Sequence, residues 1–381
     1  MRFLIASSFV PQRHSGAAGS LFAIGDAHRR RGHQVDWLWM PPEGGSRMWN
    51  ELVRIPGLQA NDIGAFLRRH NDVDAVFISQ PYAYQAFERL KPKHPDVLFI
   101  NRTHGWEPRS AESQHRYGWD SALGAGRRLL RDVSRWHRSK VCRRAVLAAD
   151  GVVAACRQDA DWIRARYELP EWRVACIPYG IAADKFPRAP RREATSGPLR
   201  LIYAGQYQER KGSKLLESVL PPLAAEFPDA QLSFVVLPEQ VPLVEQAYGA
   251  SWGRRLRICS WMPQRDLFDE FSAHDVLLFP SYFEGFGKVA IEAMAMGCVP
   301  VGFDEAAMSD LTSEGVLTCP HGDAEAFAAL LRDLLGGQVA WQRSANRAME
   351  IARGRTWDTV AAEEETFLRS LSERRGEVAA R

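Results

Sequence analysis

Short apolar runs alternate with longer amphipathic stretches along the whole chain. Six runs of strand length occur in the first half, most of them separated by stretches with helical periodicity, and six more repeat the scheme in the second half. Near-continuous apolar strands between helices are typical of parallel sheets that are covered on both faces. The pattern predicts an α/β protein of two doubly wound, Rossmann-type domains, with strands at residues 3–10, 34–40, 74–79, 97–101, 150–156, 173–178, 199–205, 231–236, 256–262, 275–281, 299–303 and 315–320.

The segment FPRAPRREATSGP, residues 186–198, predicts a linker between the halves, because it is rich in Pro, Arg and small polar residues. We therefore expect an N-terminal domain at residues 1–190 and a C-terminal domain at residues 191–355. Residues 356–381 read as a C-terminal helix, amphipathic up to residue 371 with a loose, charged end, that could pack back on the N-terminal domain. Doubly wound sheets bind ligands at the carboxyl ends of their strands, so we expect the site in a cleft where the two domains face each other.

Composition sets the class of protein and its expected surroundings. Of the 381 residues, 46% are hydrophobic and 25% charged, values that are ordinary for a soluble protein. No run of 18 or more apolar residues occurs, and the N-terminus lacks the features of a signal peptide, so we expect a cytoplasmic protein. The six cysteines show no C-x-x-C spacing and lie mostly in apolar runs, which predicts reduced core residues: Cys142, Cys156, Cys176, Cys259, Cys298 and Cys319.

Charge is distributed unevenly. Residues 1–199 carry 31 Lys and Arg against 20 Asp and Glu, whereas residues 200–381 carry 18 against 26. Much of the basic excess lies in residues 127–144, where basic side chains alternate with Leu, Val and Trp at roughly helical spacing. Two interpretations remain open: a solvated helix face, or a surface that attracts anionic lipid headgroups or an anionic substrate. Nucleic acid is not an expected partner, because no groove-reading motif accompanies the patch.

The stretch EGFGKVAIEAMAMGC, residues 284–298, predicts a ligand-binding turn. An apolar strand and a Pro-Ser break precede it, and a short helix ended by Gly297 follows the turn. Gly285 and Gly287 would let the backbone adopt positive φ values and come close to a ligand. The amino end of the helix would present N–H groups suited to phosphate or sugar oxygens.

Glu292 lies within that helix among apolar residues only. A buried carboxylate is costly unless hydrogen-bond donors surround it. A nearby backbone amide or an arginine could supply the donors, and so could a vicinal diol such as a ribose. The residues by themselves leave both interpretations open.

The two glutamates also carry a resemblance to a known family. Glu284 and Glu292, with EGFG between strand and helix and EAMAMGCVPV after it, resemble the E-x7-E motif of retaining glycosyltransferases of family four, which have the GT-B fold. Nearly the whole chain takes part in the match, which continues through IYAGQYQERKGSKLLE (202–217), ICSWMPQRDLFDEFSAHDVLLFPS (258–281), ADGVVAACRQDADWI (149–163), IPYGIAADKF (177–186) and RRRGHQV (29–35).

The resemblance implies that the C-terminal domain binds a nucleoside-diphosphate sugar. Glu284 would contact hydroxyls of the donor sugar and Glu292 the hydroxyls of the ribose. Backbone groups around Met262 would contact the base. The backbone of the glycine turn would contact the sugar and the diphosphate through Gly285, Phe286, Gly287 and Lys288.

A basic loop follows the first strand of the C-terminal half. By the resemblance, Lys211, six residues after Gly205, would neutralise the diphosphate as it leaves, a stabilisation that suits the chemistry itself. The family usually has Arg directly after that glycine, whereas this chain has Gln206. Arg210 is the candidate for replacing the missing charge, although the sequence does not give the direction of its side chain.

Three further segments of the N-terminal half correspond to family motifs, with two substitutions among them. Gly16 and Ala17, in PQRHSGAAGS, match a Gly-Gly loop that lines the family's cleft near the diphosphate, with Ala17 in place of the second Gly. His104, in INRTHGWE, matches a family histidine near the donor sugar, although a histidine at a strand end is often structural. Tyr179 replaces an Asn of the family's IPNGVD-like segment, a change that we expect to affect the interdomain hinge.

The resemblance implies a retaining glycosyltransferase that moves a hexose-type sugar from the donor to an acceptor hydroxyl and forms an α-glycosidic bond. Such an activity belongs to cell-surface glycan or natural-product glycosylation. The acceptor is unknown; an anionic or lipid-linked molecule is one candidate, with peripheral membrane contact through residues 127–144. We expect no cofactor and no metal, because the family uses no metal there and no paired ligand spacing links His14, His28, His33, His70 and His94.

Other functions fit the same architecture. A sugar-nucleotide epimerase would need no acceptor, and a phosphorylase would need inorganic phosphate. A non-catalytic protein that binds nucleotide sugars or an anionic glycan is a third alternative, which Gln206 favours because the usual cation is absent there.

Overall fold

The computed structural model shows two compact units. Unit 1 comprises Met1–Tyr179 and Trp357–Arg381, and unit 2 comprises Gly180–Thr356. The predicted linker and the domain boundary predicted at residue 190 lie outside the described residues, apart from residue 198. The structure describes residues 1–13, 16–41, 44, 50, 55–79, 83–118, 125–182, 198–311 and 316–379.

A parallel six-stranded sheet forms the centre of unit 1, in the order β2-β1-β3-β4-β5-β6. All six strands that the apolar runs of the first half predict are present. They are β1 (Arg2–Ser7), β2 (Gln34–Trp39), β3 (Ala75–Ser79), β4 (Leu98–Arg102), β5 (Gly151–Ala154) and β6 (Val174–Cys176).

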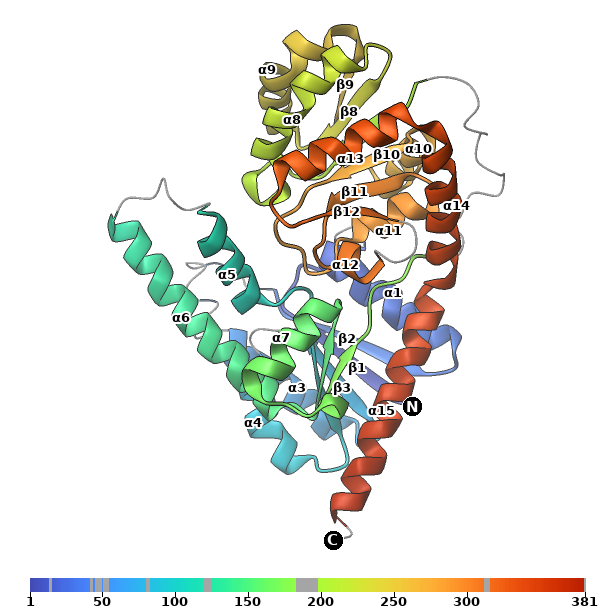
Figure 1. The fold of residues 1–381 in the computed structure, drawn as a ribbon. Helices are drawn as coiled ribbons and strands as arrows, with labels where there is room; N and C mark the ends of the chain where they lie inside the picture. Colours follow the sequence, from blue (N-terminus) through green and yellow to red (C-terminus); the bar gives the residue numbers. More distant parts are fainter. Residues whose placement is uncertain are drawn as a thin grey trace. The chain divides into compact units, whose positions relative to one another are not determined.

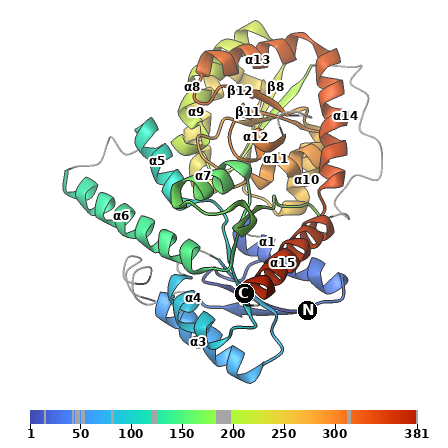
Figure 2. The same ribbon diagram turned by 60° about the horizontal axis from the view of Figure 1, so that its bottom comes forward.

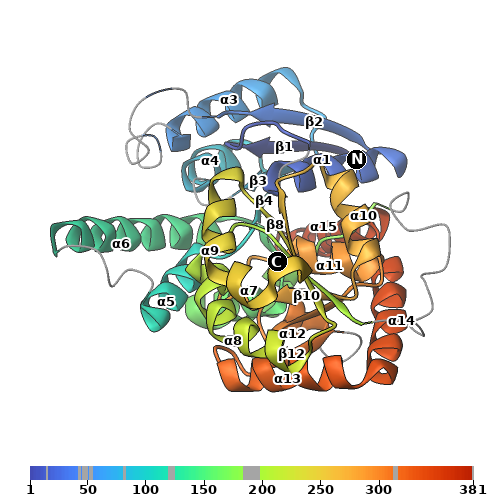
Figure 3. The ribbon, with the colours of Figure 1, turned by 90° about the horizontal axis from the view of Figure 1, so that it is seen from above.

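Helices cover both faces of this sheet, which explains why its strands are almost continuously apolar. One face packs on α3, α4 and the carboxyl-terminal part of α6, and the other carries α1 and α15; Figure 3 shows β1 between α3 and α1. The elements are α1 (Gly16–Arg30), α3 (Ile55–Arg69), α4 (Tyr84–Leu90), η2 (Lys91–Lys93), α5 (Glu107–Tyr117), α6 (Ala125–Ala148), α7 (Arg157–Tyr167), η3 (Glu171–Arg173) and α15 (Trp357–Ala379).

Unit 2 repeats this architecture with a second parallel sheet, in the order β12-β11-β10-β7-β8-β9. The six apolar runs of the second half are all strands of this sheet, so the predicted α/β class with two doubly wound sheets is confirmed. The strands are β7 (Arg200–Ala204), β8 (Gln231–Val236), β9 (Leu256–Ser260), β10 (Val276–Phe279), β11 (Val299–Phe303) and β12 (Leu317–Cys319).

The helices of unit 2 also lie on both faces of its sheet. The main core packs α8, α9 and α13 on one face (Figure 1), and Figure 2 shows β11 and β12 between α13 and α11. The elements are η5 (Glu209–Lys211), α8 (Ser213–Glu226), η6 (Pro238–Gln240), α9 (Val241–Trp252), η7 (Gly253–Arg255), α10 (Gln264–Ala273), α11 (Lys288–Ala295), α12 (Ala307–Leu311), α13 (Ala324–Gly336) and α14 (Gln338–Gly354).

The C-terminal helix is longer than the sequence predicts. Instead of loosening after residue 371, α15 continues to Ala379. Two arginines fix this last part to unit 1: Arg375 donates to the Val97 carbonyl at 3.1 Å, and the Arg374 guanidinium lies 5.4 Å from the centre of the Trp172 ring. Charged residues that suggested a loose end therefore contact the rest of unit 1.

The cysteines are free thiols, as predicted. Four of them are buried and two, Cys176 and Cys259, are partly exposed. They lie in or beside the strands and helices of the cores, where a thiol packs as a small apolar group.

Candidate functional site

Two loops meet at the carboxyl edge of the unit 2 sheet. Lys211, in the turn after β7, forms an ion pair through Nζ with Oε1 of Glu284, in the turn after β10. The Arg210 guanidinium donates to the Phe283 carbonyl at 2.8 Å, and the Tyr282 amide donates to the Arg210 carbonyl at 2.9 Å. The two segments that the sequence marks as basic loop and glycine turn are thus joined through charge and backbone.

Burial controls the charges in this pair. Burial alone would raise the pKa of the Glu284 carboxyl, but the positive charges of Lys211 and Arg210 and the hydrogen bonds from Lys211 and Ser281 bring that pKa below its usual range. Burial also lowers the pKa of the Lys211 ammonium, against the attraction of Glu284. The structure therefore holds an ionised carboxylate beside a desolvated cation, which is a suitable arrangement for an anion and a hydroxyl-bearing ligand.

Glycine is required at two points of these loops. Gly212 has a φ of +82°, and a Cβ there would lie 2.3 Å from the Pro280 carbonyl oxygen. Gly287 has a φ of +89°, and a Cβ there would lie 2.7 Å from the Phe279 ring. The prediction of a positive φ is wrong for Gly285, because Gly287 alone makes the left-handed turn into α11.

Glu292 is buried, as the apolar helix predicts, but the protein supplies it with partners. The Gln264 amide donates to Oε1 of Glu292 at 2.7 Å, and the Lys288 ammonium lies 3.7 Å from the same oxygen. Burial still raises the pKa of this carboxyl above its usual value, against the effects of Lys288 and Gln264. A further donor, such as a diol, would therefore stabilise the ionised form.

Glu305 belongs to the same region, although no motif in the sequence marks it. It follows β11, and its Oε1 accepts from the backbone N–H of Glu284 at 3.3 Å. Its side chain is buried, and the His321 ring lies 3.8 Å from Oε2. The next residue, Ala306, has a φ of +49°, which is uncommon for a residue with a side chain. The sequence feature that could have identified Glu305 is its place in an acidic pair directly after an apolar strand.

The remaining predicted donor residues of unit 2 lie at the same edge of its sheet. Gly205 has a φ of +149° and directly follows β7. Gln206 is exposed, its backbone carbonyl accepts from the Tyr203 hydroxyl at 2.7 Å, and its side-chain oxygen accepts from Gln208 at 3.0 Å. Met262 follows β9 in the segment before α10. Arg210, the candidate for the missing charge, lies close enough to Glu284 for its charge to lower the pKa of that carboxyl.

In unit 1, His104 lies in the segment after β4 and has partners on both ring nitrogens. Nδ1 is hydrogen bonded to the Tyr179 hydroxyl, and Nε2 lies 3.2 Å from Oγ of Ser79. Burial, with a smaller effect of Arg102, lowers the pKa of His104 to about 3, so the ring is neutral at ordinary pH. The Phe9 ring contacts it edge-on, with centroids 5.3 Å apart.

Tyr179 therefore has a role beyond that of a hinge residue. Its side chain is buried, and its hydroxyl orients the His104 imidazole. Burial raises the pKa of this hydroxyl, so it stays protonated and available for that hydrogen bond. The residue that replaces the family's Asn is thus the hydrogen-bond partner of a predicted site residue.

Gly16 and Ala17 form the first turn of α1. Oγ of Ser20 donates to the Gly16 carbonyl at 2.8 Å, and a Cβ on Gly16 would meet nothing within 4 Å. The described residues thus leave open space beside Gly16, which either solvent or a ligand could occupy.

A possible set of metal ligands occurs elsewhere in unit 1. One ligand atom from each of His28, His33 and Glu365 lies within 4.8 Å of the others, a proximity that sequence spacing does not reveal. Arg31, however, donates to both oxygens of Glu365, at 2.6 and 2.9 Å. The carboxylate is already neutralised by a cation, so these residues fit an ion pair better than a metal ion.

Comparison with known proteins extends this picture. Residues 198–336 match the family model described as glycosyl transferases group 1. In this segment the chain is similar to the group 1 glycosyltransferases. The family resemblance carried by the two glutamates is thus confirmed at this level, and the matched segment contains the basic loop, the glycine turn and Glu292.

Two curated relatives show the range of this family. A D-inositol 3-phosphate glycosyltransferase of Streptomyces avermitilis is 31% identical over 57% of this chain and 51% of its own length. A glycogen synthase of Mycobacterium tuberculosis is 28% identical over 70% of this chain and 61% of its own length. The chain thus spans between half and two thirds of these relatives, so their substrates do not transfer to it directly.

Solved structures show the same fold. A sucrose-phosphate synthase of Thermosynechococcus elongatus superposes with a TM-score of 0.75 at 16% identity, covering 97% of this chain and 99% of that one. Anabaena HepE in complex with UDP and glucose superposes with a TM-score of 0.67 at 14% identity, covering 96% and 99%. At these identities the similarity establishes the fold alone.

Proposed function

We propose that this protein is a retaining glycosyltransferase that moves a hexose-type sugar from a nucleoside-diphosphate sugar to an acceptor hydroxyl and forms an α-glycosidic bond. The observation that carries the proposal is the ion pair of Lys211 with Glu284 on a glycine turn at the amino end of α11. A cation, a carboxylate and helix amides at one edge of a doubly wound sheet suit a diphosphate joined to a polyol.

In the proposed reaction, the bond between the anomeric carbon and the diphosphate oxygen breaks as the acceptor oxygen attacks the same face. The Lys211 ammonium stabilises the charge that develops on the diphosphate. A phosphate oxygen takes the acceptor proton, and Glu284 holds hydroxyls of the sugar. Glu292 receives the ribose hydroxyls in addition to the Gln264 amide. No protein nucleophile and no metal ion is part of this proposal.

Nucleotide release measures this function directly. The protein is incubated with UDP-, GDP- and ADP-glucose, with and without acceptor extracts, and with or without a chelator. We expect acceptor-dependent, chelator-resistant release of one nucleoside diphosphate and an α-anomeric signal in the product by NMR. Conversion of the donor without acceptor would indicate an epimerase, dependence on inorganic phosphate a phosphorylase, and binding without turnover a non-catalytic protein; each result would contradict the proposal.

Helix α6 supports a membrane-bound or lipid-linked acceptor. Leu129, Val133 and Trp136 are 66%, 56% and 60% exposed, and their spacing places them on one helix face. The Lys140 ammonium lies 3.7 Å from the centre of the Trp136 ring and continues this face toward Arg143. Figure 1 shows that the amino-terminal half of α6 extends beyond the sheet of its own unit.

An exposed apolar stripe on a basic helix is typical of helices that lie in the interface of an anionic bilayer. A merely solvated face would not expose a Trp, a Leu and a Val in one line. Among the described residues, no helix is long and apolar enough to cross a membrane. We therefore propose peripheral contact through residues 127–144, with the apolar stripe inserted between headgroups.

A further inference from the structure

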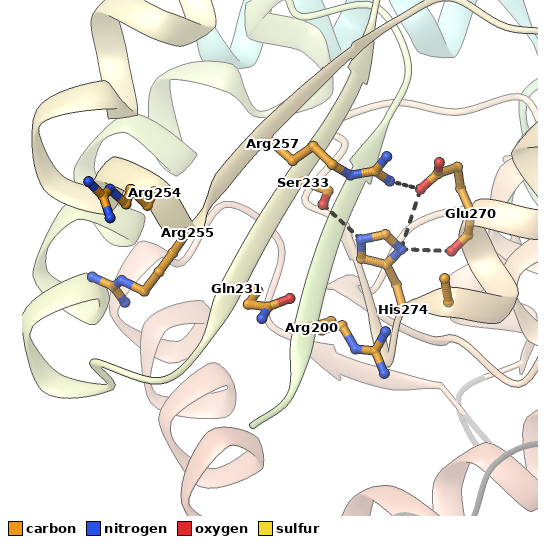
Figure 4. Close-up of a pocket in the computed structure, with 9 residues that line it drawn as sticks. Arg200, Gln231, Ser233, Arg254, Arg255, Arg257, Glu270 and His274 are labelled. Atoms are coloured by element: carbon orange, nitrogen blue, oxygen red, sulfur yellow. Dashed lines mark hydrogen bonds and ion pairs between the residues drawn. The ribbon is translucent and has the colours of Figure 1, made fainter. Parts of the chain in front are cut away.

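A basic cavity lies at the amino ends of β7, β8 and β9 in unit 2 (Figure 4). Its volume is about 480 Å³. Four arginines, Arg200, Arg254, Arg255 and Arg257, and one carboxylate, Glu270, line it and give it a formal charge of +3. The candidate donor residues follow the carboxyl ends of strands in the same sheet, so the cavity is a different place.

The strand register explains why this corner of the sheet is polar. Arg200 pairs with Gln231 between β7 and β8, and Ser233 pairs with Arg257 between β8 and β9. Alternate residues of a strand point to the same face, so these four side chains share one face of the sheet. The intervening residues point into the apolar core on the other face. The alternation of polar and apolar residues at the start of these strands therefore places a polar patch on the face of the sheet opposite the apolar core.

Two of the lining arginines already have partners. Arg257 forms an ion pair with Glu270, and Figure 4 shows the two side chains directed toward each other. Arg255 donates to carbonyl oxygens at the end of α8 and just beyond it. The Arg200 guanidinium and the Gln231 amide, by contrast, make no side-chain hydrogen bond or ion pair with residues that the structure describes. They can donate to a ligand, and so can the N–H groups of Arg257 that do not contact Glu270.

The floor of the cavity is fixed by His274. Its Nδ1 lies 2.7 Å from the Glu270 carbonyl oxygen and its Nε2 lies 2.8 Å from Oγ of Ser233. Burial lowers the pKa of this ring, which is therefore neutral. Because the Glu270 carbonyl only accepts, Nδ1 carries the proton and Nε2 accepts from the Ser233 hydroxyl. The floor adds no charge and leaves the arginines to select the ligand.

We propose that this cavity binds a phosphomonoester of a small polyol, with the phosphate between Arg200 and Arg257. Arg200 and Arg257 are two strands apart and offset by two residues along the strand, so their Cα atoms are separated by about 12 Å. Two arginine side chains that extend toward each other can contact one phosphate across that distance. Guanidinium groups match phosphate in geometry and charge. The volume suits a sugar phosphate, and the Gln231 amide and Glu270 remain for its hydroxyls.

Isothermal titration calorimetry with glucose 6-phosphate, glucose and inorganic phosphate tests the proposal. We expect glucose 6-phosphate to bind, more tightly than inorganic phosphate, and glucose not to bind. Arg200→Gln and Arg257→Gln should each weaken binding about tenfold, the effect of one charge-assisted hydrogen bond. Arg353→Gln, which removes one exposed arginine of α14 outside the cavity, is the matched control and should bind like the parent.

A second comparison separates this site from the donor site. Lys211→Ala should leave the affinity for glucose 6-phosphate unchanged, because Lys211 lies at the opposite edge of the sheet. Loss of binding in Lys211→Ala, or unchanged binding in both cavity variants with native melting temperatures, would place the ligand elsewhere and overturn the proposal. Binding of glucose 6-phosphate by a protein without transferase activity would contradict the proposed function but support this site.

Discussion

Lys211 and Glu284 form an ion pair although 73 residues separate them in the sequence. The lysine follows β7 and the glutamate follows β10, and these strands are neighbours in the sheet. Each side chain is mostly shielded from water, with 20% and 9% exposed, so each keeps the other charged. In the proposed reaction, Lys211 would contact the diphosphate instead of Glu284. Glu284 would contact the sugar hydroxyls instead of Lys211.

Removal of either partner should affect both activity and stability. We expect Lys211→Ala and Glu284→Ala each to lower transfer at least about 100-fold, as loss of a transition-state donor does. Each should also destabilise the protein by about 3 kcal/mol, because one charge stays buried without its partner. Initial rates and urea unfolding measure the two effects.

The double variant and a surface lysine provide the controls for this pair. Lys211→Ala with Glu284→Ala should be less destabilised than the sum of the single changes, because no buried charge is left alone. Lys214→Ala removes an exposed lysine that pairs with Glu217 on α8 and should behave like the parent. Full transfer activity in both single variants would refute the site.

Glu292→Gln should stabilise the free protein while weakening nucleotide binding. Burial raises the pKa of Glu292, so its contribution to stability is complete below the unfolded pKa and is lost as the pH rises through the folded pKa. At pH 7 a neutral glutamine avoids the cost of a buried, ionised carboxylate, and we expect a melting temperature higher by about 2–4 °C. Thermal unfolding with and without UDP, GDP and ADP should show a smaller ligand-induced shift in the variant.

Gln264→Leu serves as the opposite case. It removes the 2.7 Å hydrogen bond to Glu292 and leaves the carboxylate in place. The melting temperature at pH 7 should then fall, because the buried charge loses a donor. A fall for Glu292→Gln would show that the ionised carboxylate is already stabilised in the free protein, and a rise for Gln264→Leu would show that the hydrogen bond from Gln264 does not stabilise it.

His104 should make the protein acid-sensitive. Burial lowers its pKa to about 3 from the usual 6.5, so its stabilising contribution is complete above pH 6.5 and is lost as the pH falls toward 3. We expect the melting temperature of His104→Gln to decrease less between pH 7 and pH 4 than that of the parent. His70→Gln, at a histidine outside the buried core, is the control and should follow the parent curve. Parallel curves for parent and His104→Gln would show that the ring is not held neutral.

Glu364 should be essential for the stability of unit 1. It forms an ion pair with Arg102, with only 2% and 3% of the two side chains exposed, and its Oε2 lies 2.8 Å from Nε2 of His28. Glu364→Gln removes the carboxylate charge that pairs with a buried guanidinium, which we expect to cost about 3–5 kcal/mol. Glu373→Gln, at an exposed position of α15, should change stability by less than about 0.5 kcal/mol. Urea unfolding compares the two, and equal values would show that Arg102 does not depend on Glu364.

The apolar stripe of α6 should bind anionic bilayers. Trp136→Ala and Leu129→Ser should each reduce co-sedimentation with vesicles of phosphatidylglycerol and phosphatidylcholine several-fold, because each removes exposed apolar area from the interface. Added salt should reduce binding too, since the basic side chains act through screened charge. Leu243→Ser, at a residue 53% exposed on α9, is the control outside the stripe. Binding that ignores salt and lipid charge would contradict the membrane proposal.

Local patterns in the sequence determined the twelve strands, the two-sheet class and the character of the turn before α11. Apolar runs indicate strands that are buried on both faces of a parallel sheet. The E-x7-E spacing indicates a local turn followed by one face of a short helix. Both are properties of neighbouring residues, which is why they can be predicted without knowledge of the fold. The α15 error arose where charged residues, read as signs of a loose end, make contacts with distant segments.

Only the tertiary structure decided which distant residues meet. Gln264 supplies the donor for Glu292, Glu305 holds the backbone of Glu284, and Tyr179 orients His104. The order of strands in a sheet differs from their order in the chain, so no spacing rule brings these partners together. The sequence by itself therefore determined which residues carry charge and where the backbone turns, whereas the packing of the strands determined the partner, the burial and hence the pKa of each charged group.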